Sequence, residues 1–469
     1  MADVDFLGLT PLMIVALAPM IIMLTVAVRR AVMAIYGFSL LAFVLALLSI
    51  YVVIPLLPHS ISTLLIIDRV TVVLWSVIIL ASIAVTILSR DYLLNQESEK
   101  EEYFIILFIS TLGAMLLVSA INFVSLFLGL ETLSISLYVL IAYRRISDQC
   151  IEAGIKYLIL ASVSSAFLLF GMGLIYLDTG SLEFLHIAQT VHSFTVADSL
   201  LYMGFGMMIV GLGFKLALVP FHMWTPDIYQ GAPTPVATYI ATVSKAAVMT
   251  VFLRFFYAID GYNNFTFIRI ISVIAILSMF VGNLLALKQQ NVKRILAYSS
   301  ISNMGYLLVT LLVGGENGIQ AAIFYIISYL ITTLGAFGVI TLFSTQQHEA
   351  EMLMDYKGLF WKRPWMAFVF TLAMLSLAGI PLTAGFMGKF YIVFEGIHAS
   401  LWLLVICLIV NSVIGLYYYL RVISVMFLEA DDYTLPAVSM VEKGLMGLIA
   451  VGIVGIGIFP QWIIQLIFH

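Results

Sequence analysis

One stretch of the chain, residues 201–257, decides the fold, and it reads LYMGFGMMIVGLGFKLALVPFHMWTPDIYQGAPTPVATYIATVSKAAVMTVFLRFFY. It contains two apolar segments of membrane-spanning character that flank a short polar turn. Each segment carries one lysine in its interior, Lys215 in the first and Lys245 in the second. A lysine at the centre of a bilayer costs about 2.5–3.5 kcal/mol on insertion scales. Two such lysines indicate a functional site within the membrane rather than chance substitution.

The first of these segments has the pattern of an interrupted helix. Four glycines precede Lys215, and Pro220 follows it. Because proline removes a backbone donor and clashes with the preceding turn, the helix is expected to kink or unwind near Lys215. Many transporters build an ion site at the membrane midplane from such a discontinuous helix. The alternative is that the glycines only allow close helix packing, which leaves the lysines unexplained.

The composition excludes a soluble globular protein. The 469 residues are 63% hydrophobic and only 10% charged, which predicts an all-α polytopic membrane protein. The two cysteines, Cys150 and Cys407, form no ligand pattern, and the sequence contains no nucleotide-binding or haem motif. The lack of a basic cluster indicates no nucleic-acid partner. The chain is therefore expected to move charge without holding a metal or a redox cofactor.

Hydropathy predicts fourteen transmembrane helices. The apolar runs lie at about 10–28, 32–57, 69–89, 103–120, 122–142, 153–177, 199–230, 235–257, 267–287, 294–313, 317–344, 364–397, 402–427 and 443–466. The seventh and twelfth runs are too long for one straight span. Fourteen lysines and arginines lie in or beside the loops that follow odd-numbered helices, and only two, Arg69 and Arg269, lie beside the other loops. By the positive-inside rule the odd loops are cytoplasmic and both termini are periplasmic.

A second interrupted segment has the same pattern as the first. Residues 376–396 read SLAGIPLTAGFMGKFYIVFEG, in which three glycines and a proline precede Lys389. A broken, lysine-bearing helix thus occurs at helix seven and again five helices later, and an odd offset reverses direction through the membrane. The pattern therefore predicts two inverted five-helix repeats within one membrane domain over residues 1–469. These repeats would be helices 4–8, about residues 103–257, and helices 9–13, about residues 267–427.

One acidic residue, Glu131, is predicted to lie inside the membrane. It falls about ten residues into the fifth helix, roughly 15 Å deep at 1.5 Å per residue, and Lys215 reaches a similar depth. Because a buried carboxylate and a buried ammonium each need a counter-charge, the sequence favours a pair between Glu131 and Lys215. The alternative is a structural ion pair that only fixes helix packing.

The buried lysines predict a path for protons. The protonation of Lys215 depends on how near its anionic partner lies, so a movement of a few ångströms can change it. Lys215, Lys245 and Lys389 lie at similar depth in separate helices, and we interpret them as a lateral proton path along the membrane plane. His222, just after the first break, titrates in the right range to bridge between them. A capping or packing role is the alternative for His222.

Two further basic residues have simpler interpretations. Lys156 follows Glu152 by four residues in the first turn of the sixth helix, and this spacing favours an ion pair at the interface. Arg254 lies within a turn of its helix end, so its head group can extend outward to water.

Four stretches carry a resemblance to a known family. They are GFKLALVPFHMWTPDIYQGAPTPV (213–236), VKRILAYSSISNMGYLL (292–308), SLAGIPLTAGFMGKFY (376–391) and IGLYYYLRV (414–422). Together they resemble the subunit N family of bacterial respiratory complex I, the NADH–quinone oxidoreductase, over nearly the whole chain. The first stretch is shared in looser form by all antiporter-like subunits, including those of multisubunit sodium/proton antiporters and membrane-bound hydrogenases. The lysine in FMGKF favours subunit N, because relatives often have glutamate there.

The resemblance implies fourteen helices and two inverted repeats, each forming half of a proton pathway. Matched by motif, the residues of that pathway are Glu131, Lys215, Lys245, Lys389, Lys156 and His222. One position departs from the family pattern: Asn303 stands where many relatives carry histidine. Because asparagine cannot take up a proton at neutral pH, a relay through that position must use water. The second repeat also lacks an acidic residue in helix ten.

The expected function is that of a proton-translocating membrane-arm subunit in the bacterial inner membrane. FMN and iron–sulfur clusters would belong to partner subunits, and the neighbours would be other antiporter-like and small membrane subunits and lipids. One alternative is a subunit of a sodium/proton antiporter or a membrane-bound hydrogenase. Another is a membrane scaffold whose buried charges only lock helices together.

Overall fold

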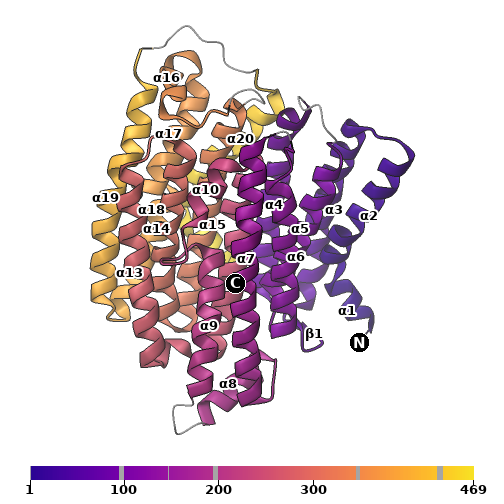
Figure 1. Ribbon diagram of the computed structural model, residues 1–469, viewed down its shortest axis with the longest axis vertical. Helices are drawn as coiled ribbons and strands as arrows, with labels where there is room; N and C mark the ends of the chain where they lie inside the picture. Colours follow the sequence, from indigo (N-terminus) through magenta and orange to yellow (C-terminus); the bar gives the residue numbers. More distant parts are fainter. Residues whose placement is uncertain are drawn as a thin grey trace. The chain divides into compact units, whose positions relative to one another are not determined.

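The computed structural model describes residues 2–94, 100–145, 147–193, 199–344, 349–429 and 437–468. These residues are almost entirely helical, as a chain in a bilayer must satisfy its backbone groups internally (Figure 1). Among them, one antiparallel hairpin is formed by β1 (His59–Ile61) and β2 (Leu65–Ile67), with His59 opposite Ile67. The chain divides into two compact units.

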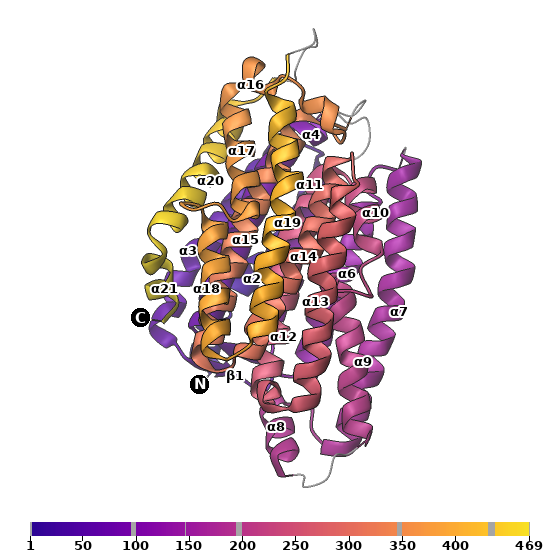
Figure 2. The ribbon, with the colours of Figure 1, turned by 90° about the vertical axis from the view of Figure 1, so that its left-hand side faces the viewer.

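The first unit comprises Met1–Ile83, Glu99–Trp224 and Val243–Ile268. Its helices are α1 (Ala2–Gly8), α2 (Thr10–Val28), α3 (Val32–Val53), the start of α4 (Arg69–Leu94), α5 (Glu102–Ser119), α6 (Phe123–Ile141), α7 (Asp148–Thr179), α8 (Phe184–Ser193), α9 (Ser199–Leu216) and α12 (Lys245–Ala258), with short 3-10 turns at Ile54–Leu56 and Gly261–Asn263. Long helices α7 and α9 run side by side (Figure 2).

The second unit comprises Ala84–Ser98, Thr225–Thr242 and Arg269–His469. Besides the end of α4, it contains α10 (Trp224–Gly231), α11 (Thr234–Tyr239), α13 (Phe265–Leu287), α14 (Val292–Val313), α15 (Gly315–Phe343), α16 (Leu359–Lys362), α17 (Pro364–Ala378), α18 (Ala384–His398), α19 (Trp402–Met426), α20 (Met440–Ile458) and α21 (Pro460–Phe468), with a 3-10 turn at Leu353–Tyr356. A one-turn π-helix, Ile240–Ser244, joins α11 to α12 in the chain. The core of this unit is formed by α14 and α15. In the apolar stretch of each helix, 94% of the residues are buried.

The predicted number of helices agrees with the structure once its interruptions are counted. Thirteen stretches within the described residues are long and apolar enough to cross a membrane. The remaining predicted helix, residues 364–397, is present as two shorter helices, α17 and α18, which a break at residues 379–383 separates. The assignment of inverted repeats stays a prediction.

The predicted interruption near Lys215 is present, and its backbone geometry is that of a Schellman motif. The amide of Leu218 donates to the Gly213 carbonyl over 2.8 Å, and the amide of Ala217 donates to the Phe214 carbonyl over 2.9 Å. Ala217 has a φ of +61°, in the left-handed region where glycine is the usual residue. The helix therefore ends at Leu216, directly after Lys215, and Ala217 takes the position where glycine normally marks such an ending.

The second interruption uses the same motif. The amide of Ile380 donates to the Leu375 carbonyl and the amide of Gly379 donates to the Ser376 carbonyl, each over 3.0 Å. Here the left-handed position is occupied by glycine, since Gly379 has a φ of +85°. Both lysine-bearing helices are thus broken by the same backbone geometry.

Close packing also explains part of the glycine pattern before the first break. A Cβ atom on Gly171 of α7 would lie 2.6 Å from the carbonyl oxygen of Gly204 on α9, and one on Gly211 would lie 2.7 Å from Leu168 Cβ. These glycines allow α7 and α9 to touch along their backbones. Helix packing and helix interruption are therefore both encoded in this stretch.

We predict that Gly385→Ala destabilises the second unit by about 3 kcal/mol or more, because the added Cβ would lie only 1.9 Å from the backbone oxygen of Ser376. The matched control is Gly206→Ala, where an added Cβ meets nothing within 4 Å among the described atoms. Thermal unfolding of the detergent-purified chain measures both. Equal unfolding midpoints for the two variants would contradict this description of the break.

Candidate functional site

The first unit holds Lys215 at the C-terminal end of α9, with its side chain only 4% exposed. Its ammonium donates a hydrogen bond of 2.6 Å to the hydroxyl of Ser134 on α6, and it lies 5.7 Å from the centre of the Tyr157 ring on α7. A helix C-terminus favours a nearby cation because its last carbonyls point outward. The break therefore creates an environment in which a buried ammonium can be kept.

Glu131 lies in the middle of α6, one turn before Ser134. Its carboxylate accepts a hydrogen bond of 2.5 Å from the hydroxyl of Ser165 on α7. Within the described residues no ion pair joins Glu131 to Lys215, although the two charges interact. The expected direct contact is absent because the Lys215 ammonium and the Glu131 carboxylate each form a hydrogen bond with a serine hydroxyl instead. No role for these two serines was expected from the sequence.

Lys245 is 1% exposed and is the first residue of α12, directly after the π-helical turn Ile240–Ser244. A π-helical turn inserts a residue into the helix and changes the direction in which the following side chains point. Sequence patterning predicted a buried lysine here but gave no sign of the altered helix.

His222 lies in the turn between α9 and α10 and is 7% exposed. Both of its ring nitrogens are buried; neither is hydrogen-bonded to another side chain among the described residues, and the backbone of Pro220 lies close by. A buried polar atom without a partner is uncommon and suits a site that water or a proton visits. The bridging role of His222 stays a prediction.

Lys156 of α7 forms the pair that its spacing favours. Its ammonium lies 2.6 Å from the Glu152 carboxylate, and the two side chains are 47% and 64% exposed. The structure thus gives Lys156 a partner on its own helix. A role in the proton path stays a prediction.

The second unit holds Lys389 on α18, with 8% of the residue exposed. Its ammonium donates to the carbonyls of Leu377 and Ala378 over 2.8 and 3.1 Å and to the hydroxyl of Ser412 over 3.0 Å. These two carbonyls belong to the last turn of α17, which the Schellman motif leaves without partners. Lys389 therefore completes the end of the helix before the break, with neutral oxygen atoms as its acceptors.

Asn303 belongs to a buried network of hydroxyl and amide groups. Its amide donates to the Ser299 carbonyl over 2.8 Å, and its oxygen accepts from the Tyr325 hydroxyl over 2.7 Å. The hydroxyl of Tyr419, from the GLYYYLRV stretch, contacts the Ser299 hydroxyl. The tyrosines were not among the predicted site residues, although their place in an apolar helix was a signal for buried hydroxyl groups.

A small cavity of about 10 Å³ lies between Lys389 and this network, and Asn303, Tyr325 and Ser328 are among its lining residues. That volume is about the smallest that holds one water molecule. The hydroxyl of Ser328 is buried and makes no hydrogen bond to any other described residue. The lining therefore offers a water molecule both donors and acceptors beside Lys389.

A buried ion pair in the second unit was missed by the sequence analysis. Lys293, one of the fourteen basic residues that lie in or beside the odd-numbered loops, is fully buried and contacts the Glu349 carboxylate. The hydroxyl of Thr234 donates to the same carboxylate over 2.5 Å, and the Tyr92 hydroxyl contacts it as well. The partners come from four separate segments of the chain, so no local pattern could have indicated the cluster.

Comparison with known proteins identifies a family. Residues 120–415 match the family model described as NADH:quinone oxidoreductase/Mrp antiporter, TM. A curated relative, NADH-quinone oxidoreductase subunit N of Ectopseudomonas mendocina (strain ymp), is 41% identical over 98% of this chain and 95% of its own length.

Solved structures agree with the fold. A chain of respiratory complex I from Thermus thermophilus with bound aureothin superposes with a TM-score of 0.85 at 31% identity, covering 97% of this chain and 98% of that one. A chain of the Mrp complex from Dietzia sp. DQ12-45-1b gives a TM-score of 0.88 at 18% identity, covering 100% of this chain and 96% of that one, which shows the fold alone.

We predict an acid-dependent stability from Glu349. Burial raises the pKa of this carboxyl, but the charge of Lys293 and the hydrogen bonds around it outweigh burial and hold the pKa below its ordinary value of 4.5. Such a group stabilises the fold above its unfolded pKa, and the contribution is lost as pH falls through the folded pKa. Glu349→Gln leaves Lys293 buried without its counter-charge and should cost about 3–5 kcal/mol at neutral pH.

The measurement is the thermal unfolding midpoint between neutral pH and about pH 3, where the difference between variant and wild type should shrink. Glu429→Gln, which changes an exposed carboxylate, is the control and should follow the wild type. A difference for Glu349→Gln that is constant over the whole pH range would argue against the ion pair.

Proposed function

Because the chain belongs to the NADH:quinone oxidoreductase/Mrp antiporter family of transmembrane proteins, we propose that it is a proton-translocating membrane-arm subunit of an NADH–quinone oxidoreductase. One observation carries the proposal. In the described part of the chain, the buried ammonium groups of Lys215 and Lys389 rest on hydroxyl and carbonyl oxygens rather than on carboxylates. A lysine held in this way can give up its proton without breaking a direct ion pair.

Glu131 supplies the electrostatic control in this proposal. Its carboxylate interacts with Lys215 without direct contact. A displacement of Glu131 therefore changes the balance between the protonated and the neutral form of Lys215. Lys215 would release its proton toward Lys245 when Glu131 moves away. Lys389 would serve the later transfer, with a water molecule in the adjoining cavity in place of the histidine that Asn303 replaces.

NADH oxidation, FMN and iron–sulfur clusters are assigned to partner subunits, and the neighbours in the membrane to other antiporter-like and small subunits and lipids. The excess of lysine and arginine in odd-numbered loops supports periplasmic termini in a bacterial inner membrane.

A subunit of a sodium/proton antiporter is the second candidate. The chain shares its fold with the Mrp chain at a TM-score of 0.88, but at 18% identity this match shows the fold alone. Identity of 41% over almost the full length of a curated NADH-quinone oxidoreductase subunit favours the first proposal.

Purification through a tag on this chain tests the assignment of partners. We expect a large assembly with flavin and iron–sulfur absorbance that reduces quinone with NADH. Recovery of small hydrophobic partners alone, with sodium/proton exchange after reconstitution, would replace the first proposal by the second.

We predict that Lys215→Met lowers NADH-driven proton translocation by about a hundredfold, because proton transfer by a positioned side chain typically contributes 10²–10⁴-fold. The measurement is the acidification of proteoliposomes that contain equal amounts of assembled complex. Lys443→Ala removes an exposed lysine from α20 and should pump as the wild type does. Wild-type pumping by assembled Lys215→Met would reject the role of Lys215.

A further inference from the structure

The guanidinium of Arg254, on α12, is held by hydrogen bonds to neighbouring residues instead of extending to water. Its guanidinium forms two hydrogen bonds with the Asp68 carboxylate, of 2.6 and 2.9 Å. It also donates to the Val118 carbonyl at the end of α5 over 2.7 Å and to the Thr71 hydroxyl of α4 over 2.8 Å. The side chain is 14% exposed, so the expectation of an outward-reaching arginine is wrong. The reason is that the Asp68 carboxylate lies within hydrogen-bonding distance of the guanidinium and pairs with it.

The ion pair stays charged at neutral pH. Burial raises the pKa of the Asp68 carboxyl, but the charge and hydrogen bonds of Arg254 outweigh burial and hold the pKa below its ordinary value. The two parallel hydrogen bonds between a planar guanidinium and a carboxylate also fix direction, which a single lysine contact does not. The hydrogen bonds of Arg254 therefore hold α12 at one height along its axis relative to α4 and α5.

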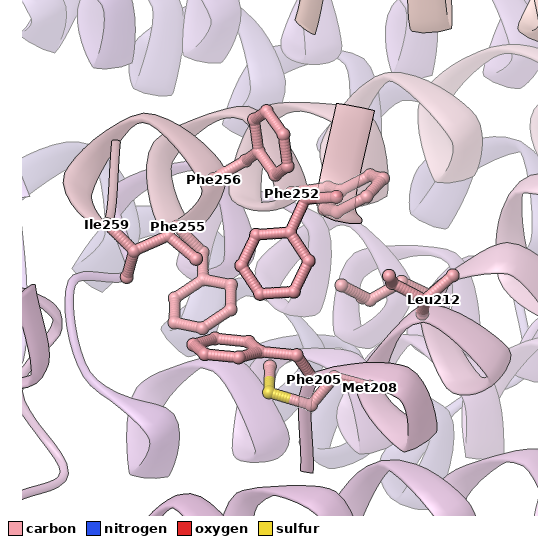
Figure 3. A pocket seen from close by; sticks show the side chains of 9 residues that line it. Phe205, Met208, Leu212, Phe252, Phe255, Phe256 and Ile259 are labelled. Atoms are coloured by element: carbon pink, nitrogen blue, oxygen red, sulfur yellow. The ribbon is translucent and has the colours of Figure 1, made fainter. Parts of the chain in front are cut away.

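The other side of α12 is held by less directional contacts. Phe255 of α12 packs against Phe205 of α9 with ring centres 5.6 Å apart, and Phe252 and Phe256 line the same small apolar cavity of about 10 Å³ (Figure 3). Ring contacts accept either an offset-stacked or an edge-to-face arrangement, so they fix the height of a helix less strictly than two parallel hydrogen bonds do. The cavity also leaves room for small shifts on this side.

The helix places Lys245 and Arg254 on opposite sides. At about 100° per residue, nine residues turn by about 180° and rise about 13 Å along the axis. Lys245 and Phe252, seven residues apart, share the side that faces the rings. Arg254 therefore cannot act on Lys245 by contact, but it can set the height and rotation at which α12 presents Lys245.

We propose that the Asp68–Arg254 ion pair is the positioning device for Lys245: it fixes the register of α12 against α4 and α5. This inference rests on the proposed function, since it gives Lys245 a place in the proton path. The Asp68–Arg254 pair takes no part in proton transfer itself.

The test is the number of protons translocated per NADH oxidised by the assembled complex in proteoliposomes. Arg254→Met should lower this ratio strongly, since misplacing Lys245 by about 1 Å can slow its proton transfer up to a hundredfold, so that NADH oxidation outruns it. Arg254→Lys keeps the charge but loses the paired hydrogen bonds, so its ratio should lie between those of Arg254→Met and the wild type. Arg69→Met, which removes an exposed arginine next to Asp68, is the matched control and should keep the wild-type ratio.

Lys245→Met is measured alongside to separate the two proposals. A low ratio for Lys245→Met together with a wild-type ratio for assembled Arg254→Met would overturn the positioning role and leave the proposed function intact. If Arg254→Met does not assemble, a wild-type ratio for Arg254→Lys overturns the positioning role equally. Wild-type ratios for both Lys245→Met and Arg254→Met would instead count against the proton path.

Discussion

A buried ammonium needs oxygen atoms as acceptors, and the backbone of a straight membrane helix offers none because its carbonyls are used within the helix. The two broken helices resolve this constraint. Breaking α17 leaves its last carbonyls without partners, and Lys389 donates to them. At the end of α9 the same backbone motif places Lys215 against the Ser134 hydroxyl. Helix interruption and lysine burial are thus two parts of one arrangement, which occurs once in each unit.

The features that the sequence predicted depend on local properties. Hydropathy located the spans, and glycine and proline located both interruptions, because each effect acts within a few residues of the backbone. The pairing of Glu131 with Lys215 was a weaker prediction, since two opposite charges at similar depth need not touch. Ser165 and Ser134 lie within reach and take the hydrogen bonds that a direct contact would have used. Serine is common in membrane helices, so nothing in the sequence marked these two.

Other features could not be predicted because they depend on segments that are distant in the chain. Glu349 meets Lys293, Thr234 and Tyr92 only in the folded structure. Arg254 was expected to reach water, and only the position of Asp68 shows why it does not. Both cases concern a charge near a helix end, where local sequence cannot distinguish an exposed charge from a paired one.

The central claim is that the buried lysines transfer protons rather than lock helices together, and Lys245 tests it most directly. The measurement is the ratio of protons translocated to NADH oxidised by complex that contains Lys245→Met, compared at equal amounts of assembled enzyme. Methionine keeps the length of the side chain and removes the exchangeable proton. The account predicts a ratio well below that of the wild type. An unchanged ratio in normally assembled complex would contradict it and would leave Lys245 with a structural role.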